Sequence, residues 1–136
     1  MANLNMTTAF NRYGAKLSNA QWAVSAISNS GELVVSCWKH YLSARDGKLI
    51  YTDRLSRWSG NKPGNNLLRS HLEAAIKNKT NVRLVIAKSD DPATIDSGES
   101  ASGTQNTFGV REDLVGQVSA FDGDEFVLEF VKDSDY

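Results

Sequence analysis

The side chains best suited to chemistry are gathered in residues 54–79, where cations and an aromatic ring precede an amphipathic segment. The four cations that would gather near the start of that segment are Arg54, Arg57, Lys62 and Arg69. A guanidinium suits phosphate because its planar fork donates paired hydrogen bonds. A helix start adds unpaired backbone N–H groups and a partial positive charge. We therefore predict that a phosphate-bearing or otherwise anionic ligand binds here.

The same stretch supplies the turn that would present those N–H groups. Gly64 permits the chain to turn, and Asn65 or Asn66 can cap the helix that follows. We expect the helix over residues 67–78, and we include Gly64, Asn65 and Asn66 in the candidate ligand site. The stretch lacks both the G-x-x-x-x-G-K-[ST] and the G-x-G-x-x-G phosphate-binding patterns, so the ligand is not assigned from a motif.

Three tryptophans are the second candidate group. Trp22 and Trp38 lie in apolar, alternating segments, which predicts that they are core residues of paired strands. Trp58 instead follows Arg57 in a polar loop, where it is either packed against the core or exposed to a ligand. An exposed Trp58 could stack on a base, and such a stack contributes on the order of 1–3 kcal/mol.

Two histidines and one cysteine complete the residues that could do chemistry. His40 and His71 could act as general bases in phosphoester cleavage if the fold brought them together. We favour the alternative that they are two unrelated structural or surface histidines, and an enzyme is not indicated. Cys37 lies inside an apolar strand, where a thiol packs as a small hydrophobe. No metal site and no cofactor is predicted, because this set is too small for a usual zinc site and no calcium-loop pattern is present.

Charge is divided unevenly along the chain although the net charge is −1. Residues 54–88 carry eight Lys or Arg against one acid, a net of +7, whereas residues 89–136 carry two against twelve, a net of −10. This asymmetry predicts either a basic binding face backed by an acidic one or two segments that pair with each other.

The overall composition is that of an ordinary globular protein. The chain has 136 residues, of which 40% are hydrophobic, and we expect a single domain over residues 1–136. No apolar run reaches the roughly 20 residues that a membrane-spanning helix needs, and the N-terminal residues show no apolar signal region. The lone cysteine favours a reducing compartment, so we expect a cytoplasmic protein with no membrane partner.

Hydrophobic periodicity predicts six strands besides the helix. We expect them at residues 21–27, 32–41, 49–52, 81–87, 115–120 and 125–131. The first three would form an antiparallel meander around a loop at 42–48, the strand at 81–87 would be central, and Asp122-Gly123 would turn the last hairpin. The polar residues at about 89–107 are expected to form a flexible loop that begins with one helical turn at residues 91–95.

These elements predict an α+β fold. We expect a strongly bent antiparallel or mixed sheet, or a small β-barrel of about six strands, with one main α-helix. By strand count and composition the chain is similar to PUA-like and EVE-like small barrels. That resemblance implies a protein that reads nucleic acid, often at a modified base, through a basic rim and an aromatic pocket. It rests on no shared motif and transfers no residue.

Three hypotheses for function follow. The first is a small binding domain that recognises nucleic acid or a phosphorylated nucleotide through the basic loop and the helix start. The second is a protein-interaction module, such as an inhibitor or adaptor in conflict between phage and bacterial host, that uses the acidic residues 89–136. The third is a small hydrolase or nuclease that depends on His40 or His71.

Overall fold

The computed structural model describes residues 5–19, 22–58, 60–98 and 106–133. The strands are β1 (Ser25–Ile27), β2 (Leu33–Trp38), β3 (Leu42–Arg45), β4 (Lys48–Arg54), β5 (Val82–Ser89), β6 (Asn106–Val110), β7 (Leu114–Phe121) and β8 (Glu125–Lys132). The helices are α1 (Met6–Asn11), α2 (Lys62–Asn78) and α3 (Pro92–Asp96), with two 3-10 helices, η1 (Lys39–Tyr41) and η2 (Leu55–Trp58). None of the helices in these ranges is long and apolar enough to cross a membrane.

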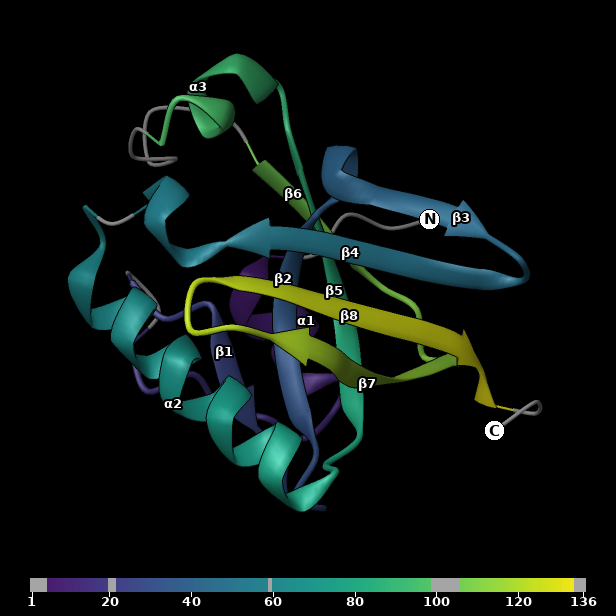
Figure 1. Ribbon diagram of the computed structural model, residues 1–136. Coiled ribbons are helices and arrows are strands. Elements are labelled where there is room, and N and C mark those ends of the chain that lie inside the picture. Colours follow the sequence, from purple (N-terminus) through teal and green to yellow (C-terminus); the bar gives the residue numbers. More distant parts are fainter. Residues whose placement is uncertain (1–4, 20–21, 59, 99–105, 134–136) are drawn as a thin grey trace.

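The strands form one mixed sheet. Their order is β1-β2-β5-β7-β8-β4-β3, and β6 pairs with β5 outside this path. β2 and β5 are parallel, whereas the other pairs are antiparallel. β4 and β8 run across the direction of β2 and β5, so the sheet is strongly bent (Figure 1). The α+β prediction with one main helix, α2, is confirmed, but the sheet has two ends and is not closed, so the small-barrel alternative is not supported.

The predicted three-stranded meander is wrong. β1 and β2 do form an antiparallel hairpin, but the other neighbour of β2 is β5, and β4 lies between β3 and β8. Residues 42–45, which we expected in a loop, form β3 because Asp46 and Gly47 make a tight turn with positive φ angles of 53° and 78°. This extra hairpin and β6 raise the strand count in the described chain from the six predicted to eight.

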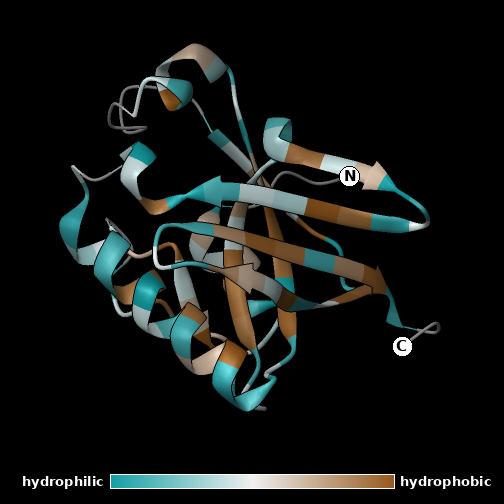
Figure 2. Cartoon of the chain, viewed as in Figure 1, coloured by the Kyte–Doolittle hydropathy of each residue, from teal (hydrophilic) through white to brown (hydrophobic). Residues whose placement is uncertain are grey.

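The strand predicted to be central, β5, is buried on both faces, as is β2 beside it. Leu33, Val35 and Leu84 belong to one core cluster, while Val34 and Val85 belong to a second cluster on the opposite face. Two-sided burial explains why these strands are almost continuously apolar, and both are brown along most of their length in Figure 2. The sheet is therefore covered by α2 on one face and by α1 on the other.

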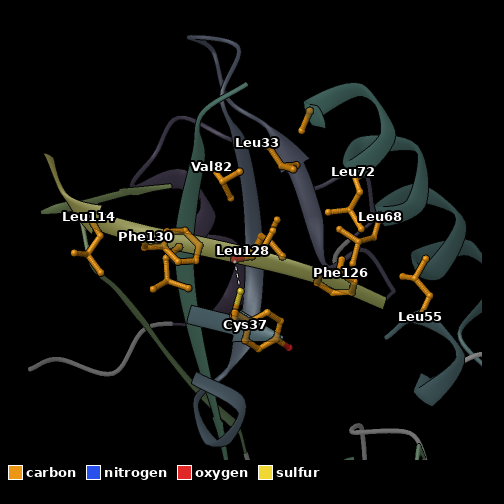
Figure 3. Close-up of a cluster of buried hydrophobic side chains, with 14 residues drawn as sticks. Leu33, Cys37, Leu55, Leu68, Leu72, Val82, Leu114, Phe126, Leu128 and Phe130 are labelled. Atoms are coloured by element: carbon orange, nitrogen blue, oxygen red, sulfur yellow. Dashed lines mark hydrogen bonds between the residues drawn. The ribbon is translucent and has the colours of Figure 1, made fainter. Parts of the chain in front are cut away.

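α2 packs on the sheet through a regular apolar stripe. Leu68, Leu72 and Ala75 are buried against strand residues that include Phe126, as Figure 3 shows for the two leucines. The helix begins at Lys62, five residues before the predicted start. Asn61 accepts a hydrogen bond from the Gly64 amide at 3.2 Å and so caps the helix in place of Asn65 or Asn66. Pro63 occupies the first turn, which tolerates proline because the N–H groups there have no helical partner.

Two further local predictions are confirmed. β7 and β8 form the hairpin that Asp122-Gly123 was expected to turn. The predicted helical turn after Asp91 is α3. Of the remaining residues in the expected flexible loop, 106 and 107 belong to β6, and 99–105 lie outside the described residues.

Candidate functional site

All three tryptophans of the chain line one cavity. The cavity has a volume of about 570 Å³, and Trp22, Trp38 and Trp58 are each half-buried in its wall. Phe108 of β6 supplies a fourth aromatic ring to the wall. Sequence reasoning assigned Trp22 and Trp38 to the core, and they do pack against the core clusters, but both also face this cavity.

Four separate parts of the chain bring these rings together. Trp22 precedes β1, Trp38 ends β2, Trp58 ends η2, and Phe108 lies in β6. The floor of the cavity is formed by core side chains, of which Tyr51, Leu68 and Phe126 are at most 2% exposed. The cavity is therefore mostly aromatic and apolar and reaches from the surface to the main core.

An ion pair between Asp53 and Arg57 forms the charged part of the described lining. Arg57 Nε donates to Asp53 Oδ1 and Arg57 Nη2 donates to Asp53 Oδ2, both at 2.7 Å. The Arg57 side chain is only 14% exposed and the Asp53 side chain only 5% exposed. Asp53 also accepts hydrogen bonds from the Tyr51 hydroxyl at 3.0 Å and from the Arg54 amide at 2.8 Å. Both carboxylate oxygens are thus used twice, which leaves the cavity wall with little unbalanced charge.

This ion pair and its burial shift the pKa values of Arg57 and of the neighbouring Tyr51. Burial favours the neutral form of Arg57, but the hydrogen bonds and the charge of Asp53 outweigh it, so the pKa of the guanidinium is raised. Burial, followed by the charge of Asp53, raises the pKa of Tyr51 well above its usual value. Arg57 stays charged and Tyr51 stays neutral at physiological pH.

The indole nitrogen of Trp58 lies in an unusual environment for a polar atom of a cavity wall. Its indole Nε1 is buried and has no hydrogen-bond partner among the described residues. An unsatisfied buried donor costs about 1–3 kcal/mol, and such groups are uncommon in native proteins. The position of Trp58 is therefore maintained by the packing of the segment around it, at a cost in hydrogen bonding.

The predicted ligand-binding residues are distributed over more than one surface. Arg57 and Trp58 line the cavity, and the chain continues along its edge through Gly60 and Asn61. Lys62, at the start of α2, is exposed. Arg69 donates to the side-chain oxygens of Asn66 at 3.1 Å and Asn65 at 3.5 Å.

Two of the amides predicted to bind an anion, those of Gly64 and Asn65, are already used within the chain. The Gly64 amide donates to the Asn61 side chain and the Asn65 amide donates to the Asn61 carbonyl at 2.9 Å. Gly64 and Asn65 are themselves buried. This arrangement follows from the earlier helix start, which places these residues inside the first turns rather than before them.

A second, smaller hollow adjoins the aromatic cavity. It has a volume of about 360 Å³, and Asp53 and Arg57 line both spaces. Arg54, Thr52 and Ser56 also line this hollow. Arg54 is 60% exposed and lies 3.6 Å from a carboxylate oxygen of Glu125, a geometry that holds the guanidinium only weakly.

The two histidines occupy unrelated positions. His71 Nδ1 lies 2.8 Å from the Ser25 hydroxyl, and burial lowers the pKa of His71. His40 Nε2 lies 3.0 Å from Asp96 Oδ1. Within the described ranges, no group of three or more His, Cys, Asp or Glu side chains is placed to hold a metal ion.

The acidic C-terminal third is partly neutralised by basic residues from elsewhere in the chain. Among the described residues, the Lys and Arg ion pairs that join it to the first two thirds are Arg12–Glu112, Lys48–Glu129, Arg54–Glu125 and Arg83–Asp133. The strands that carry several of these residues are neighbours, β4 with β8 above all. Part of the charge asymmetry of the sequence is thus resolved by pairing inside the sheet.

Sequence reasoning missed Asp53 and the meeting of the tryptophans. Asp53 lies four residues before Arg57, a spacing that allows an ion pair in a helical turn, and this was an available signal. The convergence of Trp22, Trp38 and Trp58 left no local signal, because it depends on how distant strands pair. No protein-family model, curated protein or solved structure matches this chain.

Proposed function

We propose that this chain is a binding domain for nucleic acid or a nucleotide, and that a single base occupies the aromatic cavity. The observation that carries the proposal is that Trp22, Trp38 and Trp58, from three separate segments, line one space. Indole rings stack on any base, with a contribution of about 1–3 kcal/mol for each stacked base. The volume of about 570 Å³ also lies within the range of roughly 300–1,000 Å³ that is common for small-ligand sites.

The charge of the lining supports an uncharged ring rather than a cation. Aromatic cages also bind quaternary ammonium groups, through attraction between the cation and the ring faces. Among the described lining residues the one carboxylate is Asp53, which is already neutralised by Arg57 and holds four hydrogen bonds. No carboxylate in this described lining is therefore left over to attract a cation, and a neutral heterocycle fits it better.

We assign the phosphate of the ligand to the neighbouring hollow. Arg54 lies there with Thr52 and Ser56, and Glu125 also lines the hollow. The Ser56 hydroxyl donates to Asp124 at 2.8 Å, so Arg54 is the group that would contact the phosphate. The contact of Arg54 with Glu125 is long and exposed, so the guanidinium can be recruited by a phosphate at small cost. Lys62 and Arg69, which are part of the predicted site, would add sequence-independent attraction for a longer strand.

The test is a titration of intrinsic tryptophan fluorescence with single-stranded DNA, duplex DNA, single-stranded RNA and mononucleotides at low salt. We expect quenching by at least one of these ligands and a steep loss of affinity as salt is added. Trp58→Ala should weaken binding by about 1–3 kcal/mol. Arg54→Ala should weaken it less and reduce its dependence on salt.

Ile27→Ala is the matched control for these variants. Ile27 is 48% exposed, lies in β1, and does not line the cavity, so its replacement should leave affinity unchanged. Absence of quenching by every ligand, or equal losses in Trp58→Ala and Ile27→Ala, would refute the proposal.

The two other hypotheses receive less support from the geometry. An acidic docking face would use exposed carboxylates, and the charges of Glu112, Glu125 and Glu129 are offset in part by exposed ion pairs with basic residues. A histidine-dependent hydrolase would need a base beside the cavity, and neither His40 nor His71 lines it. If no nucleic acid or nucleotide binds, a pull-down with and without nuclease and a hydrolase assay on the His40→Ala and His71→Ala variants would decide between them.

A further inference from the structure

One wall of the aromatic cavity belongs to the short helix α3. Ile95, in this helix, is 2% exposed and lines the cavity. Its carbonyl oxygen accepts a hydrogen bond of 2.7 Å from Arg57 Nη1. Ile95 is the one buried residue among the five of α3, so this helix is attached to the core by a single apolar side chain.

Asp96 supplies the polar attachment on the outer side of α3. Its Oδ1 accepts a hydrogen bond of 2.5 Å from the Tyr41 hydroxyl and lies 3.0 Å from His40 Nε2. The Tyr41 ring is also within 4.2 Å of the His40 ring and 5.1 Å of the Arg57 guanidinium. A continuous set of contacts thus joins Asp96, through η1, to the Asp53–Arg57 ion pair of the cavity lining. The hydrogen bonds from Tyr41 and His40 also lower the pKa of Asp96.

The backbone after α3 lies directly against η2. Gly98 has a φ of +80°, and a Cβ atom built on it would lie 2.0 Å from the Arg57 carbonyl oxygen. Glycine is therefore required both for the left-handed conformation and for the close approach of the two backbones. Any side chain at this position would push the segment away from η2.

We infer that α3 is a movable wall of the cavity, held in place by Asp96 and Arg57 and displaced when the Asp96 contacts break. A helix of five residues has too few turns to be stable by itself, so its position depends on these attachments. The Asp96 side chain is 55% exposed, and exposed ion pairs are weak. This inference rests on the proposed function only for the identity of the ligand that the wall encloses.

The first experiment breaks the outer attachment. Asp96→Ala is compared with Glu129→Gln, which removes an exposed ion pair of 3.2 Å whose two residues do not line the cavity. Because all three tryptophans line the cavity, acrylamide quenching of total fluorescence reports access to it. We expect stronger quenching in Asp96→Ala alone. Exchange of the Ser97 amide hydrogen, which is bonded to the Ala93 carbonyl, should accelerate by about 2- to 5-fold.

A second variant displaces α3 by a steric route. Gly98→Ala is compared with Gly123→Ala, because both glycines have positive φ but only Gly98 has backbone atoms in the way of a Cβ. Both variants share the conformational strain, so a difference between them isolates the contact with η2. Acrylamide quenching should increase in Gly98→Ala and remain unchanged in Gly123→Ala.

The ligand readout uses a panel of free adenosine, guanosine, cytidine and uridine. The nucleoside that binds best should dissociate about 2- to 5-fold faster from Asp96→Ala than from Glu129→Gln, with the free energy of unfolding unchanged between the two. Unchanged quenching and exchange in both Asp96→Ala and Gly98→Ala would overturn the movable wall, even if a nucleoside binds. Increased quenching with no nucleoside bound would support the wall and count against the proposed function.

Discussion

Arg57 and Asp53 are joined by two parallel hydrogen bonds of 2.7 Å, and a third donor of Arg57 reaches the carbonyl oxygen of Ile95 at the same distance. This single side chain therefore connects β4, η2 and α3. The sequence predicts that Arg57 binds phosphate, and in the structure its guanidinium donates hydrogen bonds to Asp53 and Ile95. The polar and aromatic parts of the candidate site depend on the same few residues.

Arg57→Ala should destabilise the protein strongly, by about 3–5 kcal/mol, because it leaves the buried Asp53 carboxylate without its partner. Arg54→Ala is the matched control. Arg54 is 60% exposed and 3.6 Å from Glu125, so its loss should cost less than about 1 kcal/mol. Urea unfolding of the two variants measures the difference in the free energy of unfolding. Equal losses would show that the Asp53–Arg57 pair has no special structural role.

Gly64→Ala should destabilise the protein although alanine is the better helix former. A Cβ at position 64 would lie 2.3 Å from the Trp22 carbonyl oxygen, so the start of α2 would have to move away from the cavity wall. We expect a loss of about 1–3 kcal/mol in the free energy of unfolding. Gly60→Ala, where a Cβ meets nothing within 4 Å, should change stability by less than about 0.5 kcal/mol. A stabilised Gly64→Ala variant would contradict the packing described for the start of α2.

Cys37 should resist thiol reagents in the folded protein. Its side chain is fully buried, and burial, followed by the charge of Asp53, raises the pKa of the thiol well above its usual value. Because the thiolate is the reactive form, labelling should require opening of the sheet. A chromogenic disulfide reagent should therefore react slowly with native protein and titrate one thiol per chain in urea. Rapid, complete labelling of the native protein would place Cys37 outside the core.

Stability should decline at alkaline pH. The pKa values of Tyr13 and Tyr41 are raised from 10 to about 12, mainly because burial disfavours the phenolate. The tyrosines of the unfolded chain ionise first, so this contribution to stability is complete below pH 10 and is lost as the pH rises towards 12. Ultraviolet titration of tyrosinate, combined with urea unfolding at each pH, measures both effects.

Tyr13→Phe serves as the test variant for this pH dependence. It removes one of the shifted groups, and with it the hydrogen bond from the hydroxyl to the Leu84 carbonyl at 2.7 Å. The variant should be less stable at neutral pH and should lose less stability between pH 10 and 12 than the parent protein. An unchanged alkaline slope would show that Tyr13 ionises at its ordinary pKa.

Several elements were predictable because neighbouring residues encode them. The apolar spacing of α2 requires only a helical period, and Asp122-Gly123 specifies the turn between β7 and β8 by itself. The nearly all-apolar sequence of β5 predicted a strand that is buried on both faces. The start of α2 was misplaced because Asn61, Asn65 and Asn66 are all acceptable caps, and packing of Gly64 against Trp22 decides among them.

The chain by itself therefore determined the fold class, the main helix and the final hairpin, since periodicity and turn chemistry are local properties. Only the tertiary structure decided that β2 pairs in parallel with β5, and that Trp22, Trp38 and Trp58 meet at one cavity. It also decided that Arg57 pairs with Asp53. These contacts depend on which distant strands become neighbours, and that choice is made by the burial of the whole sheet rather than by any one segment.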